Sequence, residues 1–435
     1  MHEIDAKLQE RERAGRPVAV AVVGAGQMGT EIICQIGEMR GMEVQVVVDL
    51  TAERAASAYA LSKKRVDVVQ TDDLAEAERA VRGGRRVATA SHRIATRLST
   101  VEAVVDATGQ AELGAVLAMD AIDHKKHMVM MNVECDVTIG PILRRMACNA
   151  GVVYSWAAGD EPAAIIELYR FAHALGFEIV AAGKGKNNPL DHYATPDTER
   201  AKAERRKMSA RMLCEFVDGS KTAVEMAAVS NATGLVPDVR GMHGARATVA
   251  DLTRVFVPEA DGGVLGRKGV VDFAIGVHPG VFLIVTTDNP RIREGLVQRD
   301  MGSGPYYNLF RPFHLCSLEV PLTVAHCVLY GESSGHPRDA LVSECIAITK
   351  RALEPGQVLD GIGEFCYRGS IDRAEVARRE RLLPLGLAKG CVVKARVPKD
   401  TALTYDLVEL PGQSVLLQLR RIQDQLYAQG PDALP

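Results

Sequence analysis

The chain has few aromatic residues, almost no net charge and no long apolar run. Phenylalanine, tyrosine and tryptophan make up 5% of its 435 residues, and the formal net charge is −3. So small a net charge argues against a general affinity for nucleic acid or for an anionic membrane. No run of about 18 apolar residues occurs, so we expect no transmembrane helix. Residues 1–15 are charged and lack an apolar core, which indicates a cytoplasmic protein without a signal peptide.

Paired cysteine motifs are also missing. The nine cysteines are scattered, their number is odd, and no C-x-x-C sequence occurs. This pattern predicts reduced thiols and argues against a disulfide scaffold or a thiolate zinc site. Because the net charge is small, any anionic substrate has to be held by a local cluster of positive groups.

The chain does contain a regular alternation of apolar runs and helical patterns, which begins after Pro17. This alternation predicts an α/β fold with an N-terminal Rossmann domain, that is, a doubly wound parallel sheet. The expected strands are residues 18–23, 44–48, 101–105, 128–131 and 152–155. The expected helices are residues 27–40, 112–122 and 139–149.

The length and the later loop signals predict three domains. Residues 1–160 form the Rossmann domain, residues 161–335 an α+β domain for substrate binding and dimerisation, and residues 336–435 a small β-rich domain. Within the middle domain, residues 183–196 are rich in glycine, asparagine and proline, which predicts a long loop before a basic helix. In the last domain, two segments place a glycine turn before a strand. This pattern resembles the SAF domain of sialic acid synthases and altronate-type dehydratases.

A glycine-rich turn follows the first expected strand. Gly24, Gly26 and Gly29 form a G-x-G-x-x-G sequence that opens the first expected helix. Gly24 permits the tight turn, Gly26 lets the backbone approach a pyrophosphate, and Gly29 lets helix and strand pack closely. The helix N-terminus, with Gln27 and Met28, offers amide donors to that anion. The sequence therefore predicts an NAD(P) site; the alternative is a purely structural turn.

Asp49 ends the second expected strand, twenty residues after Gly29. A carboxylate at this place accepts hydrogen bonds from the adenosine ribose and repels the 2′-phosphate of NADP. We therefore expect NAD to be preferred, although Arg54 lies close enough to accommodate NADP. The alternative is that Asp49 caps the helix that starts near Ala52.

Two further strand ends are expected to flank the cofactor, because ligands of doubly wound sheets bind beyond the carboxyl ends of the strands. Thr108 and Gly109 follow the strand that ends near Asp106. Asn132 follows the next strand and is expected near the nicotinamide. Asp106 can equally be a turn residue that bonds its own backbone.

The segment 183–188 (GKGKNN) combines two lysines with glycines and amides. Such a segment suits an anion, and a lysine beside a reacting carbonyl can stabilise an alkoxide or transfer its proton. We predict Lys184 and Lys186 as catalytic residues and Asn187 and Asn188 as substrate-binding residues. If the segment continues a strand, the two lysines lie on one face. The alternative is a solvated, flexible basic loop.

Adjacent carboxylates, Asp160 and Glu161, lie just past another expected strand. They can bind a divalent cation such as Mg²⁺ or Mn²⁺ or take a proton, and they can equally begin a helix. Four further residues in loop-like segments supply positive or titratable groups for a phosphorylated ligand: His243, Arg246, Arg311 and His314.

Several motifs together resemble the deoxyxylulose-phosphate reductoisomerase-like family, whose domain plan is similar to that of homoserine dehydrogenases. They are GAGQMGTEI, VDATG, HMVMMNVECDVTIGP, YSWAAGDEPA, AAGKGKNNPL, DGSKTAVEMAAVSNATGLVPD, GMHGAR and RPFHLCSLEVPLTVA. The resemblance implies a homodimer that uses NADPH and a divalent cation to convert deoxyxylulose 5-phosphate. Asp49 departs from the small or basic residue that suits NADPH, so an NAD-using relative that acts on another sugar phosphate or sugar acid is an alternative.

We therefore predict a reductoisomerase that couples hydride transfer to rearrangement of a small phosphorylated sugar. A plain dehydrogenase of a small alcohol, sugar acid or semialdehyde, as in homoserine dehydrogenase, is the first alternative. The second is a non-catalytic NAD-bound carbohydrate sensor. Only the reductoisomerase changes the carbon skeleton of its substrate.

Overall fold

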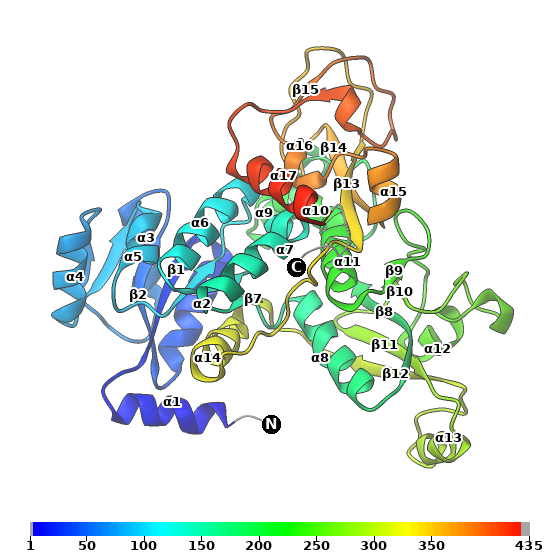
Figure 1. The fold of residues 1–435 in the computed structure, drawn as a ribbon, viewed down its shortest axis with the longest axis horizontal. Coiled ribbons are helices and arrows are strands. Elements are labelled where there is room, and N and C mark those ends of the chain that lie inside the picture. The colour runs from blue at the N-terminus through cyan, green and yellow to red at the C-terminus, as the bar shows by residue number, and fades with distance from the viewer. Residues whose placement is uncertain (1–2, 428–435) are drawn as a thin grey trace. The chain divides into compact units, whose positions relative to one another are not determined.

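The computed structural model describes residues 3–427, which form two compact units; Figure 1 labels many of their elements. Unit 1 comprises the described residues up to 163, residues 315–339 and the described residues from 418 onward. Unit 2 comprises residues 164–314 and 340–417. The three-domain division expected from the sequence stays a prediction.

Unit 1 is built on a seven-stranded sheet in the order β3-β4-β2-β1-β5-β6-β7. Every neighbouring pair of strands is parallel, which confirms the predicted doubly wound Rossmann sheet. Strands β1 and β5 are buried along their whole length because helices cover both faces of such a sheet. The strands are β1 (Val18–Val23), β2 (Met42–Val48), β3 (Val68–Gln70), β4 (Arg86–Thr89), β5 (Ala103–Asp106), β6 (His127–Met130) and β7 (Tyr154–Trp156).

The helices of unit 1 come from distant parts of the sequence. In Figure 1 the yellow α14 lies against the sheet, where it packs on β1, β5, β6 and β7. Residues 315–339 therefore complete the core of the Rossmann unit. The helices are α1 (Ile4–Arg13), α2 (Gln27–Glu38), α3 (Ala52–Leu61), α4 (Leu74–Arg82), α5 (His92–Arg97), α6 (Ala111–Asp123), α7 (Val133–Ala150), α14 (Val320–Tyr330) and the short η3 (Cys316–Leu318). Two more helices, α8 (Glu161–Ala174) and α17 (Val415–Tyr427), continue from one unit into the other.

The main difference from the expected elements of unit 1 is the start of α7. This helix begins at Val133, six residues before the expected start, because the side chain of Asn132 caps it by accepting a hydrogen bond from the Cys135 amide at 3.3 Å. Pro141 lies inside α7 and has no N–H group to donate. Strands β3 and β4 were not expected, because both are short and carry polar residues.

Unit 2 contains a mixed five-stranded sheet in the order β12-β11-β8-β10-β9. Strand β8 lies at its centre, parallel to β10 and antiparallel to β11. Helix α11 packs against β10, and a separate apolar cluster around Phe256 and Phe282 fills the sheet's core. The strands are β8 (Glu178–Lys186), β9 (Val236–Pro237), β10 (Val270–Ile275), β11 (Val281–Thr286) and β12 (Tyr306–Arg311).

The remaining elements of unit 2 are mostly short. The helices are α9 (Pro196–Arg206), α10 (Ala210–Val217), α11 (Ser220–Thr233), α12 (Leu252–Val255), α13 (Pro290–Val297), α15 (Ala374–Arg379), α16 (Leu385–Ala388), η1 (Val249–Asp251), η2 (Glu259–Asp261) and η4 (Tyr405–Leu407). Strands β13 (Ser343–Thr349) and β14 (Tyr367–Arg373) form an antiparallel pair, and so do β15 (Val392–Val393) and β16 (Val408–Glu409). Gly356 and Gly390 have φ angles of +82° and +80°, as expected for glycine turns.

The expectation of a long loop over residues 183–196 is wrong for its first four residues, which complete strand β8. Gly183 and Gly185 are glycines because neighbours approach closely, not because the chain turns. A Cβ atom at Gly183 would lie 2.5 Å from the carbonyl oxygen of Asp272, and one at Gly185 would lie 1.5 Å from that of Val277. The glycines of this segment were interpreted as a sign of a loop, but in the structure they allow close packing around a strand.

Two expectations from composition can be compared with the structure. All nine cysteines are free in the structure, and their reduced state stays a prediction. Within residues 3–427, no helix has both the length and the apolar character needed to cross a membrane.

Candidate active site

The glycine-rich turn lies between β1 and α2, where unit 1 reverses its strand order. Gly24 has a φ of +97°, and a Cβ atom there would lie 2.8 Å from the Ala107 carbonyl oxygen. A Cβ atom at Gly29 would lie 1.8 Å from the carbonyl oxygen of Gly24. At Gly26, in contrast, a Cβ atom would meet nothing within 4 Å. Gly24 and Gly29 are therefore required for packing, whereas Gly26 borders open space.

The start of α2 fits an anion. Gly26 is the N-cap residue and provides no side-chain hydrogen bond to the first helical amides. Gln27 is exposed and Met28 is half-buried, so the first turn of the helix is accessible. Uncapped amides and the helix dipole favour a negatively charged group at this position. The residues present thus fit the pyrophosphate of a dinucleotide.

Asp49, at the end of β2, forms a hydrogen bond with the glycine turn. One carboxylate oxygen accepts a hydrogen bond from the Ala25 amide at 2.7 Å, and the other accepts one from the Leu50 amide at 2.7 Å. The guanidinium of Arg54 lies 3.0 Å from the same carboxylate. The alternative that Asp49 caps α3 is wrong, because Thr51 is the N-cap residue and accepts from the Arg54 amide. A carboxylate has about four acceptor positions, which leaves room for a ribose hydroxyl.

The turn after β5 is held by buried polar side chains. Asp106 accepts hydrogen bonds from the Thr108 amide at 2.9 Å and from the Thr108 hydroxyl at 2.6 Å. This confirms the interpretation of Asp106 as a turn residue. Asn132 donates to Asp106 at 3.1 Å and to the Gln110 carbonyl at 2.9 Å. Burial raises the pKa of the Asp106 carboxyl, and the hydrogen bonds from Thr108 and Asn132 oppose this rise. Gly109, with φ +62°, follows Thr108 in this turn.

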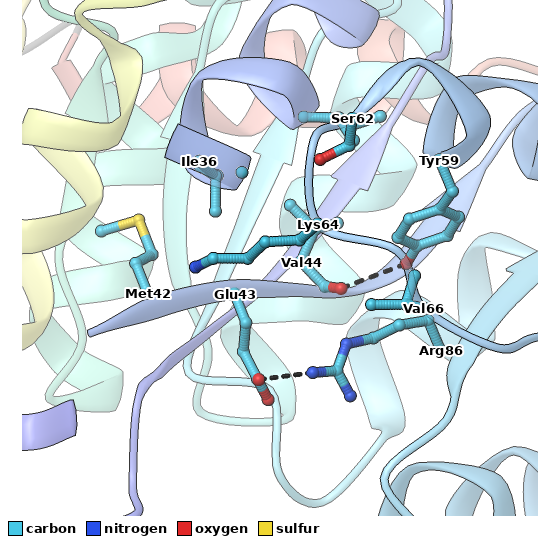
Figure 2. A pocket seen from close by; sticks show the side chains of 11 residues that line it. Ile36, Met42, Glu43, Val44, Tyr59, Ser62, Lys64, Val66 and Arg86 are labelled. Atoms are coloured by element: carbon cyan, nitrogen blue, oxygen red, sulfur yellow. Dashed lines mark hydrogen bonds and ion pairs between the residues drawn. The ribbon is translucent and has the colours of Figure 1, made fainter. Parts of the chain in front are cut away.

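A small cavity in unit 1 is not the cofactor site. Figure 2 shows it beside the N-terminal part of β2, whereas Asp49 and the glycine turn lie past the C-terminal end of that strand. Its volume is about 70 Å³, which is room for roughly two water molecules. At its rim Arg86 pairs with Glu43 at 2.5 Å, and the Tyr59 hydroxyl donates to the Val44 carbonyl at 3.3 Å. A dinucleotide does not fit there.

In unit 2, Lys184 is buried in an ion pair. Its ammonium group pairs with the carboxylate of Glu225 on α11, and the two side chains are 9% and 2% exposed. Sequence analysis did not find Glu225. The only signal was an acidic residue within a run of small and apolar residues along α11.

Lys186 lies two residues further along β8 and is also buried. Its ammonium group donates a hydrogen bond to the Phe216 carbonyl oxygen at the end of α10. The pKa of Lys186 is lowered to about 8, mainly by burial and also by the positive charge of Lys184. Glu225 and Asp218 oppose this decrease. The alternative of a solvated, flexible basic loop is therefore wrong for both lysines.

A second buried ion pair supports the turn that carries the Phe216 carbonyl. Lys350 lies 2.7 Å from Asp218, and their side chains are 2% and 0% exposed. Lys350 also donates to the carbonyl oxygens of Ala194 and Glu364, each at 2.8 Å. Asp218 accepts from the Ser220 amide at 2.8 Å and so joins α10 to α11. Neither Lys350 nor Asp218 was singled out from the sequence.

The other expected site residues lie in several places. Asp160 is buried directly before α8 and Glu161 is its first residue, which confirms the alternative that this acidic pair begins a helix. Their metal-binding role stays a prediction.

The basic and titratable residues expected around a phosphorylated ligand have separate surroundings in unit 2. His243 lies 2.8 Å from Asp238, and Arg311 pairs with Glu167 at 3.2 Å. The backbone of Arg246 pairs with Ile275, the residue opposite Lys186 on β10. His314 follows β12 by three residues and is half-buried.

Comparison with known proteins gives one family match. Residues 159–320 match the family model described as the catalytic domain of oxidoreductase DRL. No curated protein matches the chain. Every residue that the sequence assigned to catalysis or substrate binding lies within residues 159–320, and every residue assigned to the cofactor lies before them.

Solved structures show only distant similarity. A myo-inositol dehydrogenase from Corynebacterium glutamicum is 9% identical with a TM-score of 0.39, and the match covers 72% of this chain and 89% of that one. GenD2 from gentamicin A biosynthesis, in complex with NAD, is 16% identical with a TM-score of 0.36, over 73% and 87% of the two chains. A 3-ketoreductase from Actinomadura kijaniata, in complex with NADP, is 13% identical with a TM-score of 0.35, over 74% and 92%. These values are too low to assign an activity.

The Rossmann sheet with its dinucleotide turn and the match to an oxidoreductase catalytic domain define the class of the protein. The chain is an enzyme, an NAD(P)-dependent oxidoreductase.

Proposed function

We propose that the chain moves a hydride between a nicotinamide dinucleotide and a hydroxyl-bearing carbon of a small sugar-type substrate, with Lys186 as the acid–base residue. The observation that carries this proposal is the buried ammonium of Lys186, bonded to the neutral Phe216 carbonyl and lowered in pKa to about 8. A pKa near the working pH makes both protonation states available, as acid–base catalysis requires.

The chemistry follows from this protonation equilibrium. When bound in unit 1, the nicotinamide supplies or accepts the hydride. In the reductive direction, the protonated Lys186 gives its proton to the carbonyl oxygen as that oxygen gains negative charge. In the oxidative direction, the neutral amine removes the proton of the substrate hydroxyl. A buried, preorganised donor is more effective than water because it needs no reorganisation during the reaction.

Lys184 acts as a positioning residue in this scheme. Its ion pair with Glu225 holds a positive charge on the same face of β8 as Lys186. That charge disfavours a second ammonium and keeps Lys186 from remaining fully protonated. The Lys350–Asp218 pair supports the α10–α11 turn that presents the Phe216 carbonyl.

The finer parts of the proposal rest on the family resemblance and on single residues. We propose a phosphorylated sugar as substrate, a rearrangement of its carbon skeleton, a divalent cation at Asp160 and Glu161, a homodimer and a SAF-like fold for the C-terminal part. Asp49 supports NAD over NADP, since its carboxylate would face a 2′-phosphate. A plain dehydrogenase uses the same cofactor turn and the same lysine.

Product analysis tests the proposal. Phosphorylated tetroses, pentoses and their acids are incubated with NAD(H) and NADP(H), and the products are identified by NMR. A changed skeleton supports the reductoisomerase, and an unchanged skeleton with one carbon oxidised or reduced supports the dehydrogenase. The Lys186→Met variant is the matched control, because any true turnover has to decrease in it. Turnover of no substrate would support a cofactor-bound sensor, and light scattering tests the homodimer.

A further inference from the structure

Helix α9 carries two cations that share one neutral acceptor. Arg206 donates to the side-chain oxygen of Asn188 at 3.1 Å, and the ammonium of Lys202 lies 3.5 Å from the same atom. The two cations are four residues apart and therefore lie on the same face of α9. Asn188 is 9% exposed, and its amide nitrogen donates to Asn187 at 3.1 Å, which fixes the oxygen toward the cations.

Several charged groups of this region are paired with one another. Lys184 is paired with Glu225 on α11, and Lys202 lies 3.9 Å from Glu199 on its own helix. Asp218, from the α10–α11 turn, is paired with Lys350.

Two other cations have neutral hydrogen-bond acceptors. Within residues 3–427, Lys186 and Arg206 make their hydrogen bonds to neutral oxygen atoms, the Phe216 carbonyl and the Asn188 amide. A cation beside a neutral amide oxygen is weakly compensated, and such a group favours an incoming anion.

The two weakly compensated cations belong to one neighbourhood. Lys202 is close enough to Lys186 for its charge to lower the pKa of that lysine. Asn188 follows Lys186 by only two residues, and two extended residues span at most about 7 Å. Arg206 is largely exposed at its own end of α9, so a small molecule can reach it.

We propose that Arg206, Lys202 and Asn188 bind an anionic oxygen group of the substrate, a phosphate or a carboxylate, a few bonds from the carbon that reacts at Lys186. This inference rests on the proposed role of Lys186 for the position of the reacting carbon, but the anion site itself does not depend on turnover. The guanidinium of Arg206 presents paired donors that match two oxygen atoms of such a group. The amide nitrogen of Asn188 can turn toward the same oxygens once an anion takes over its partners.

Anion binding without turnover tests the site. Inorganic phosphate and malonate are titrated separately into the full chain in an uncharged buffer, with ³¹P line broadening for phosphate and saturation transfer for malonate. Arg206→Ala is compared with Arg205→Ala, which removes the same charge from the next, also exposed residue. We expect Arg206→Ala to weaken binding by roughly tenfold or more, as for the loss of one charge-assisted hydrogen bond, and Arg205→Ala to leave it unchanged.

The outcomes separate the two sources of the anion and the two proposals. Binding of phosphate alone indicates a phosphate ester, binding of malonate alone indicates a carboxylate, and either result supports the site if it depends on Arg206. Equal binding by the Arg206→Ala and Arg205→Ala variants, or no binding of either anion to the wild-type chain, overturns it. Lys186→Met should keep anion binding; loss of turnover there with binding intact supports both proposals, and intact turnover contradicts only the acid–base role.

Discussion

Lys186 donates its hydrogen bond to the backbone carbonyl of Phe216, although an equivalent lysine on the same strand has a carboxylate partner. Lys184, two residues earlier, faces the same side of β8 and pairs with Glu225. The two partners affect the ability of each lysine to lose its proton differently. A carboxylate stabilises an ammonium as a permanent charge, whereas a carbonyl in a buried site leaves it able to lose its proton.

The first prediction concerns turnover. Lys186→Met removes the acid–base group and keeps most of the side-chain volume, so we expect turnover to decrease about a hundredfold or more. The wild-type rate of oxidation should increase with pH through about 8, because only the neutral amine accepts the proton, and the rate of reduction should decrease over the same range. Steady-state pH profiles in both directions measure this. If the pH–rate profile of Lys186→Met keeps the same inflection, that inflection belongs to another group.

The second prediction uses the same lysine to relate stability to pH. Burial lowers the pKa of Lys186 from 10.5 to about 8, so the folded chain binds fewer protons there than the unfolded chain between these values. Stability therefore increases with pH in this interval, and the cost of the buried charge is fully present below pH 8. Denaturant unfolding at several pH values should show that Lys186→Met loses this increase relative to wild type. If the free energies of unfolding of wild type and Lys186→Met change in parallel with pH, the result counts against a lowered pKa of Lys186.

The third prediction concerns the Lys184–Glu225 pair. Both side chains are nearly inaccessible, so Lys184→Met removes the ion-pair partner of the buried Glu225 carboxylate and should destabilise unit 2 by roughly 3–5 kcal/mol. The double variant Lys184→Met/Glu225→Gln should recover part of the loss, which a double-mutant cycle measures. Additive single effects would show that the two groups do not interact.

The fourth prediction concerns the Lys350–Asp218 pair. Lys350→Met removes the buried partner of Asp218 and three hydrogen bonds, so we expect a loss of roughly 3–5 kcal/mol in the free energy of unfolding. Exposed Lys389 offers a control, because Lys389→Met removes an equal charge at the surface. Similar free energies of unfolding for the two variants would show that the Lys350–Asp218 pair contributes little to stability.

The fifth prediction concerns cofactor choice. Asp49→Asn removes the negative charge and keeps an oxygen that can accept from the Ala25 amide, so the glycine turn should survive. We expect the preference for NAD over NADP to fall roughly tenfold, since a repulsion of about 1.4 kcal/mol is lost. Kinetics with both cofactors give the ratio. An unchanged ratio would mean that Asp49 serves only the turn, and Arg54→Ala then tests whether the exposed guanidinium favours NADP.

Local sequence was sufficient to predict the Rossmann sheet and its glycine turn. Strand β1 spans the expected residues because six consecutive small apolar residues suit a strand buried on both faces. Gly24 and Gly29 were recognised from the local G-x-G-x-x-G sequence, and a Cβ atom at Gly29 would collide with Gly24 of the same turn. Helix α9 also followed from its own ends, since Thr195 caps it and Pro196 opens it.

Only the tertiary structure decided what these elements do together. Glu225 lies 41 residues from Lys184, and no periodic pattern links them. Gln423 of α17 is an extreme case, because its side chain bonds the Thr138 carbonyl and the Ile142 amide, on either side of Pro141 in α7. The sequence by itself determined the elements and the residue types near the site. The burial and the partners of each lysine, and therefore its pKa, depend on segments that meet only when the chain folds, because desolvation is a property of the packed environment.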